Sequence, residues 1–260
     1  MGESEILNLP DVTLVIIETR EHELMRLAAI DTLRAAQFGD VLIFCNRRTD
    51  GGFRFHQQFD DTQFEGHTAR VFEVEDWPKK EGWSQHLWNE VPRYLRTTHM
   101  LSIQWDSWIV NPAAWTDDFL KFDYIGAPWW YKDGMNVGNG GFSLRSTALM
   151  KYVRKHREKY PCTNALDDDL LCRKYRPALQ DVGFVWGTQA IADRFAFECL
   201  APVGPTFGFH GIFNWPKVLD PEALKQRVAI AARSPYIRNN PVMWEQLVKV
   251  YPDARSFIED

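Results

Sequence analysis

Cysteine is scarce in this sequence. Four cysteines are spread over 260 residues, at Cys45, Cys162, Cys172 and Cys199, and no two of them form a C-x-x-C pair. A disulfide framework needs more cysteines in a shorter chain, and a structural zinc site needs closely spaced pairs. The pattern therefore excludes both and fits buried thiols in a reducing compartment.

Long hydrophobic runs are also missing. The longest are short, such as the six residues VTLVII at 12–17, whereas a membrane-spanning helix needs about 20 apolar residues. The first residues contain no basic stretch followed by an apolar segment, which a secretory signal would have. We therefore expect no transmembrane segment and a cytoplasmic location.

Excess positive charge is absent as well. Thirty Lys and Arg face 35 Asp and Glu, for a formal net charge of −5, and no dense basic stripe follows the chain. A nucleic-acid partner is therefore not expected. Tryptophan, in contrast, is abundant at 11 residues, and aromatic residues make up 14% of the chain. Flat aromatic rings suit a core, an interface or a sugar ring, so composition alone does not choose among these and does not indicate an oligomeric state.

The order of apolar segments predicts an α/β fold. Residues 12–18 and 41–45 are short β-branched runs typical of buried strands, and 21–36 has helical spacing that Phe38-Gly39 ends. Strand, helix and strand in this order form a parallel βαβ unit. Further expected strands are 69–74, 99–104, 122–125 and 141–145; expected helices are 82–96, 146–158 and 167–174; and 46–67 is expected to be a loop.

No repeat or flexible linker divides the chain. Residues from 220 onward have helical patterns only. We therefore expect one domain over residues 1–219 and a helical C-terminal extension over 220–260 packed on the same domain. Loops that follow the carboxyl ends of parallel strands are the usual ligand-binding positions in such sheets.

The first candidate site is Gln104-Trp105-Asp106-Ser107, directly after an expected buried strand. A carboxylate at this position is well placed to hold Mg²⁺ or Mn²⁺, which prefer carboxylate and phosphate oxygens and would bridge to a diphosphate. The alternative is an aspartate that caps the next turn.

The second candidate is the glycine-rich segment 138–145, preceded by Trp129-Trp130. Three glycines within four positions allow a ligand to approach the backbone closely. The segment matches neither G-x-G-x-x-G nor a P-loop. The alternative is a turn between two strands with a tryptophan over the core; Trp129, Trp130 and Trp186 suit sugar stacking and core packing equally.

The third and fourth candidates are an acidic triplet and a histidine. Asp167-Asp168-Asp169 places three like charges together, which raises a carboxyl pKa or attracts a cation, and one of them could act as a general base. The same residues suit an acidic helix N-terminus. His210, between glycine and aromatic residues, is a candidate metal or phosphate ligand.

In this order the four stretches resemble a family of largely uncharacterised domains grouped with the GT-A glycosyltransferases. The resemblance covers roughly residues 12–213. The matching stretches are Gln104-Trp105-Asp106, residues 124–129, residues 138–146, Asp167-Asp168 and residues 207–211. It implies a single GT-A-like Rossmann-type domain with a mixed central sheet flanked by helices and a helical tail.

The function implied by the resemblance is transfer of a sugar from a nucleotide-diphosphate sugar, with UDP as the expected nucleotide, to a hydroxyl of a carbohydrate or glycoconjugate by an inverting path. Asp168 would be the base and Asp167 a partner of the sugar hydroxyls. Mn²⁺ or Mg²⁺ would be held by Asp106 and His210. Gln104 stands where such enzymes usually carry an acid. The donor would lie against Glu18, Thr19, Arg20, Gln104, Asp106, Gly140 and Gly141.

Three other functions remain open on the sequence. A non-catalytic sugar- or nucleotide-binding module would keep the tryptophans and glycines and would not need Asp168. A nucleotidyltransferase also uses acids and Mg²⁺, but it needs a glycine-rich basic loop near the first strand, and residues 18–21 do not form one. A structural domain that scaffolds a larger enzyme is the third.

Overall fold

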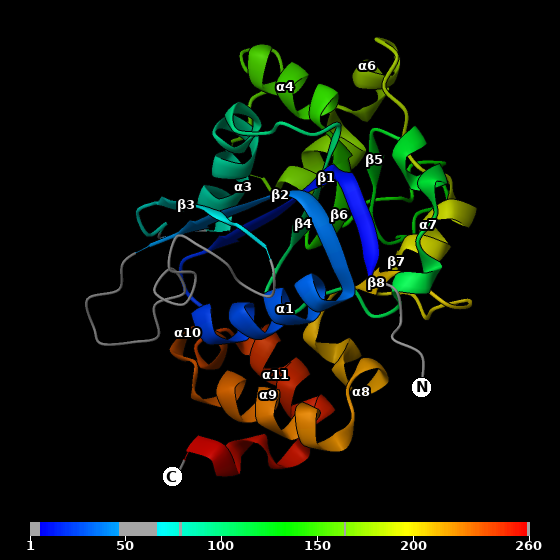
Figure 1. The fold of residues 1–260 in the computed structure, drawn as a ribbon. Helices are drawn as coiled ribbons and strands as arrows, with labels where there is room; N and C mark the ends of the chain where they lie inside the picture. Colours follow the sequence, from blue (N-terminus) through cyan, green and yellow to red (C-terminus); the bar gives the residue numbers. More distant parts are fainter. Residues whose placement is uncertain (1–5, 47–66, 78–79, 164, 259–260) are drawn as a thin grey trace.

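A mixed six-stranded sheet forms the centre of the computed structural model, which describes residues 6–46, 67–77, 80–163 and 165–258 (Figure 1). The strand order is β3-β2-β1-β4-β6-β5. The first four strands in this order are parallel, and β6 and β5 are each part of an antiparallel pair. The strands are β1 (Leu7–Glu18), β2 (Ala36–Cys45), β3 (Arg70–Glu73), β4 (His99–Ile103), β5 (Tyr124–Ile125) and β6 (Phe142–Ser146). The predicted α/β class is confirmed.

Strand β1 is buried on both faces, as its continuous apolar run predicts. Leu14 and Ile16 belong to one hydrophobic core, and Val15 and Ile17 belong to a second. This division follows from the two-residue period of a strand, which sends successive side chains to opposite faces. Helix α1 (His22–Ala35) covers the first face, and α3 (Lys80–Asn89) and α4 (Thr147–Lys155) cover the second (Figure 1).

One predicted strand start and one predicted helix end differ from the structure. The helix predicted over 21–36 is α1, which ends at Ala35, but β2 begins at once rather than at residue 41, so Phe38 and Gly39 lie in the strand. Gly39 fits there because it packs against β1, where an added Cβ would lie 1.9 Å from the Pro10 carbonyl oxygen. Helix α3 ends at Asn89 rather than at residue 96, and a 3₁₀ turn, η1 (Val91–Arg93), follows because Pro92 lacks the N–H that would continue an α-helix.

The expected helical C-terminal segment is present and packs against α1 (Figure 1). Its first helix begins where Asp220 accepts hydrogen bonds from the N–H groups of Glu222 and Ala223, both at 2.9 Å. An ion pair between Arg227 and Asp31 joins the segment to α1. The segment contains α9 (Pro221–Arg233), α10 (Pro235–Arg238), α11 (Pro241–Val250) and η6 (Pro252–Ile258).

Shorter elements lie between β4 and β5 and between α4 and α9. They are η2 (Pro112–Ala114), η3 (Asp117–Lys121), α5 (Asp167–Asp169), η4 (Leu170–Lys174), α6 (Arg176–Gln180), α7 (Gln189–Phe195), β7 (Ala196–Phe197), β8 (Gly208–Phe209), η5 (Ile212–Asn214) and α8 (Trp215–Val218). Strands β7 and β8 pair in parallel as a separate two-stranded sheet. The predicted loop at 46–67 lies almost entirely outside the described residues. Among the helices that the structure describes, none is long and apolar enough to cross a membrane.

Candidate active site

A cavity of about 510 Å³ opens at the carboxyl ends of β1 and β4. This edge of a parallel sheet is where ligands bind in open α/β folds. Nine residues that the sequence identified lie in its wall, although they come from five separate stretches of the chain. They are Thr19, Arg20, Gln104, Asp106, Gly140, Gly141, Asp167, Asp168 and His210. Glu18 lines the same cavity.

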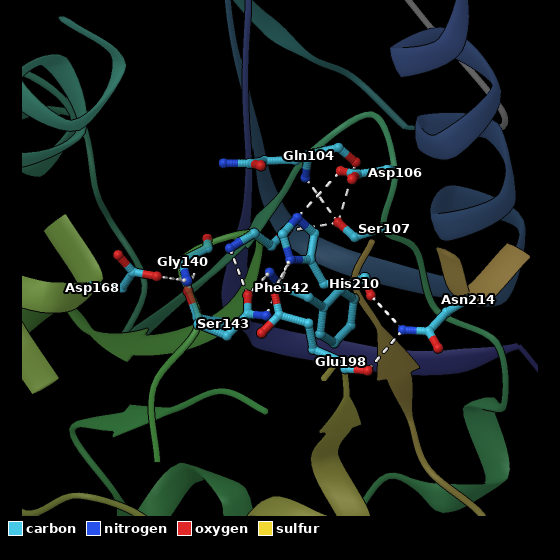
Figure 2. Close-up of polar contacts among 12 residues, drawn as sticks. Gln104, Asp106, Ser107, Gly140, Phe142, Ser143, Asp168, Glu198, His210 and Asn214 are labelled. Carbon is cyan, nitrogen blue, oxygen red and sulfur yellow. Dashed lines mark hydrogen bonds and ion pairs between the residues drawn. The ribbon is translucent and has the colours of Figure 1, made fainter. Parts of the chain in front are cut away.

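Asp106 and His210 face each other at the centre of the site (Figure 2). His210 Nε2 lies 3.3 Å from Asp106 Oδ1, and its Nδ1 lies 2.9 Å from Oε1 of Glu198. The imidazole is therefore held between two carboxylates. Burial lowers the pKa of His210, but the charges and hydrogen bonds of Asp106 and Glu198 outweigh that effect, so its pKa stands well above the usual value.

The Glu198 contact fixes the protonation of one ring nitrogen. A carboxylate only accepts hydrogen bonds, so Nδ1 of His210 carries the proton and donates it to Glu198. Nδ2 of Asn139 lies 3.1 Å from the same ring nitrogen. Burial raises the pKa of Glu198, but the hydrogen bond and charge of His210 lower it further than burial raises it. Nε2 is the ring nitrogen left facing Asp106.

The pair of Asp106 and His210 fits a divalent cation. Asp106 Oδ1 is buried, and the group that faces it is His210 Nε2 at 3.3 Å, an ion pair when the ring is protonated. A divalent cation would take the place of the Nε2 proton between these two atoms. In the part of the chain that the structure describes, no group of three or more His, Cys, Asp or Glu side chains is arranged to hold a metal. A cation here would complete its shell with phosphate oxygens and water, as Mg²⁺ commonly does. The Gln104 amide points away from Asp106 (Figure 2).

Gly141 allows the histidine to reach this position. A Cβ at residue 141 would lie 2.2 Å from His210 Nε2, so only glycine leaves room for the ring. Two hydrogen bonds fix the backbone at this point: Ser107 Oγ donates to the Gly141 carbonyl at 2.7 Å, and Gly141 N donates to Asn139 Oδ1 at 2.7 Å. Asn139 has a positive φ of 72°, which asparagine tolerates better than most residues.

Asp167 is anchored on the opposite side of the glycine turn. Its carboxylate forms a 2.6 Å ion pair with Nη1 of Arg145, whose side chain is fully buried, and accepts a 2.9 Å hydrogen bond from Ser84 Oγ. Both carboxylate oxygens therefore have protein partners, although the residue also lines the cavity. This network joins β6, α3 and α5.

Asp168 is the acid whose environment suits proton transfer. It is half-buried, and Oδ2 accepts a 2.8 Å hydrogen bond from Gly140 N. Burial, together with the charges of Asp167 and Asp169, raises the pKa of Asp168 to about 7. Residues 167–169 also form the first turn of α5, so the alternative interpretation of the triplet as an acidic helix N-terminus is confirmed as well. A π-helix, η4, follows directly, and such elements are frequent near functional sites.

A second part of the cavity, around Glu18 and Arg20, is lined by aromatic and apolar side chains, among them Trp77, Trp83 and Tyr236; we call it the aromatic end. The Arg20 guanidinium lies 4.8 Å from the ring centroid of Tyr236 and donates to the Trp77 carbonyl. Glu18 Oε1 accepts hydrogen bonds from the backbone N–H groups of Arg20 and Glu21 at 2.6 and 2.9 Å. Burial raises the pKa of Glu18, an effect that these hydrogen bonds only partly offset.

Several residues of the site carry no recognisable sequence signal. Glu198 is an isolated acid, and Arg145 sits in the glycine-rich motif without any indication that it pairs with Asp167. The C-terminal segment, helix α3 and the chain just before α3 also contribute cavity residues, which are Trp77, Trp83, Tyr236, Asn240, Met243 and Gln246. The C-terminal segment therefore forms part of the site wall.

The tryptophans that sequence reasoning considered for sugar stacking do not line this cavity. Trp129 and Trp186 are buried in the core, Trp129 against Gly138 and Trp186 stacked on Tyr124. Trp130 is 58% exposed. Trp129 and Trp186 are therefore core residues, which is the alternative to sugar stacking that the sequence left open.

The fold is that of GT-A glycosyltransferases. The structure superposes on the galactosyltransferase LgtC, crystallised with donor and acceptor sugar analogs, with a TM-score of 0.51 and 14% identity over 90% of this chain and 99% of that one. The mannosyltransferase PcManGT from Pyrobaculum calidifontis, in complex with GDP-Man and Mn²⁺, gives 0.49 and 10% identity over 97% and 73% of the two chains. The apo-form glycosyltransferase GlyE of Streptococcus pneumoniae TIGR4 gives 0.48 and 9% over 96% of this chain, which spans 62% of GlyE.

Residues 62–210, more than half of the sequence, match the family described as "Protein of unknown function (DUF5672)". The chain belongs to this family. No curated protein matches the sequence.

Proposed function

We propose that this protein is a glycosyltransferase that moves a sugar from a nucleotide-diphosphate sugar to a hydroxyl of a carbohydrate or glycoconjugate. One observation carries the proposal: a single cavity at the carboxyl ends of β1 and β4 contains a carboxylate with a raised pKa, Asp168, and a carboxylate–imidazole pair, Asp106 and His210. The GT-A fold agrees with this chemistry but does not by itself assign it.

In the proposed reaction Asp168 is the general base. The acceptor O–H proton passes to the Asp168 carboxylate, the acceptor oxygen forms a bond to the anomeric carbon, and the bond from that carbon to the phosphate oxygen breaks. The nucleoside diphosphate leaves with the electron pair, and attack opposite the leaving group inverts the anomeric centre. A pKa near 7 suits a base at neutral pH because it is ionised yet still basic.

The remaining residues bind and orient the donor in this proposal. Asp106 and His210 would hold Mn²⁺ or Mg²⁺, which supplies Lewis-acid stabilisation of the charge on the leaving diphosphate. Thr19 and Arg20 lie at the aromatic end of the cavity, where a nucleotide base would fit. Asp167 contacts a sugar hydroxyl in addition to its ion pair with Arg145.

The backbone of the glycine turn contributes as well. Gly140 and Gly141 line the cavity between the Asp168 side and the His210 side. We place the diphosphate and the donor sugar along this turn, with Gln104 beside them. UDP is the proposed nucleotide.

The test is a screen of UDP-, GDP- and CMP-sugars with mixed sugar acceptors, with release of the free nucleotide as the signal and proton NMR of the product to assign the anomer. Release that depends on acceptor, with an inverted anomer, is the expected result. A retained anomer would contradict the role of Asp168 as a simple base. Binding of a nucleotide sugar without any release would instead favour a non-catalytic binding module.

A further inference from the structure

Glu198 lies beside His210 because of the small second sheet. Strands β7 and β8 pair in parallel, with Phe197 opposite Phe209, so the next residue of each strand emerges at the same end. Asn214 fixes this end: its Nδ2 donates to the carbonyl oxygens of Glu198 and His210 at 3.0 and 2.8 Å (Figure 2). The pairing of β7 with β8, and the two Asn214 hydrogen bonds at its end, therefore place the Glu198 and His210 side chains next to each other.

The Glu198 contact selects which nitrogen of His210 is available. The carboxylate accepts a hydrogen bond from Nδ1 at 2.9 Å, and Nε2 then faces the buried Oδ1 of Asp106 at 3.3 Å. Histidines that bind metals commonly donate their other ring N–H to a carboxylate, which orients the ring and increases the basicity of the ligand nitrogen. The charge of Glu198 has no other cation within ion-pair distance among the described residues.

We infer that Glu198 is a positioning residue, which holds His210 with Nε2 directed at a divalent cation shared with Asp106. The inference rests on the metal part of the proposed function and adds to it a residue that no motif indicates. Glu198 does not ligate the cation: its oxygen is engaged by Nδ1, on the side of the ring opposite Nε2. Its removal should therefore weaken metal binding without deleting a ligand.

The experiment is a Mn²⁺ titration of the metal-free protein, with free Mn²⁺ followed by electron paramagnetic resonance. Loss of such an outer carboxylate typically costs 10–100-fold in metal affinity, and we expect a loss of that order in Glu198→Ala. Glu198→Gln keeps an oxygen that can accept the Nδ1 proton but lacks the charge, so its affinity should fall between the two. Glu158→Ala, at an exposed acid outside the cavity, is the control and should match the wild type.

A second readout separates positioning from a general loss of structure. Long-range ¹H–¹⁵N spectra of the metal-free protein, recorded at a pH at which the His210 ring is neutral, report which ring nitrogen carries the single proton. Glu198→Ala should lose the fixed Nδ1 proton while the amide spectrum elsewhere is preserved. If Glu198→Ala does not fold, Glu198→Gln provides both readouts, with a measurable affinity loss expected.

The outcomes distinguish this inference from the proposed function. A wild-type affinity that His210→Ala abolishes and Glu198→Ala leaves unchanged would overturn the role of Glu198 and leave the transferase intact. An absence of Mn²⁺ binding in the wild type would overturn the metal site and this inference together, and turnover in EDTA would then show whether the transferase survives without metal.

Discussion

Replacement of Asp168 by asparagine tests the proposed base most directly. The substitution keeps the shape of the side chain and an oxygen that can accept the Gly140 N–H, but it removes the group that takes the proton. General base catalysis contributes about 10²–10⁴-fold to a rate, equivalent to roughly 3–5 kcal/mol of transition-state stabilisation. We expect kcat to fall by that factor, with donor affinity within about threefold of the wild type because donor binding does not need the base.

The pH profile adds a signature that loss of folding would not produce. With a pKa of about 7 for Asp168, kcat/KM of the wild type should rise about tenfold per pH unit below that value and level off above it. Asp168→Asn should lose this rise. Asp169→Asn is the matched control: it removes a like charge that raises the pKa of Asp168, so the inflection should move to lower pH while the plateau rate is kept.

The same carboxyl group should make stability depend on pH in the opposite sense to an ordinary acid. Its pKa in the folded protein is above the unfolded value near 3.8, so its stabilising contribution is complete below about pH 3.8 and is lost as the pH rises through about 7. At pH 8, Asp168→Asn should therefore have a higher free energy of unfolding than the wild type, by at most about 4 kcal/mol, and a higher melting temperature. An unchanged rate, or a variant that is both inactive and less stable at pH 8, would refute the assignment.

Two further substitutions test the framework of the site. Asp167→Asn leaves the buried Arg145 guanidinium without its counter-ion, so urea denaturation should show a loss of about 3–5 kcal/mol; a loss below about 1 kcal/mol would contradict the ion pair. Gly141→Ala puts a methyl group 2.2 Å from the His210 ring, which should displace the ring, weaken Mn²⁺ binding and cost about 1–3 kcal/mol. Gly204→Ala, where nothing lies within 4 Å, is the control for the second change, and equal Mn²⁺ affinity in both alanine variants would show that the ring does not need the space.

Residues that follow a strand or lie in a glycine motif could be predicted from the sequence. Thr19 and Asp106 follow apolar runs whose period identifies buried strands, and parallel strands bring their carboxyl ends to one edge. The acidic triplet at 167–169 was recognisable because like charges in a row raise a carboxyl pKa, and the choice of Asp168 within it came from the family resemblance. The structure brings these residues to one cavity, while their roles in catalysis and binding stay predictions.

The residues that were missed depend on pairing between distant segments. Glu198 becomes significant only because β7 and β8 place it beside His210, and two-residue strands leave no periodic signal to predict. An arginine at the end of a strand is normally expected to be exposed, yet Arg145 is fully buried. Its charge is paired with Asp167, which lies 22 residues later at the start of a helix. The early start of β2 was missed for a related reason, since Gly39 serves packing against Pro10 rather than a turn.

The central proposal is that the cavity binds a nucleotide sugar and that Asp106 and His210 would hold a divalent cation for it; a thermal-shift panel tests this most directly. A ligand that binds only the folded state raises the melting temperature, and the rise grows with its concentration relative to Kd. UDP, GDP, CMP and their sugars are each measured with Mn²⁺ and with EDTA, which removes the cation. The account predicts a shift with one nucleotide class that EDTA abolishes and that Asp106→Ala reduces. No shift with any nucleotide would contradict it.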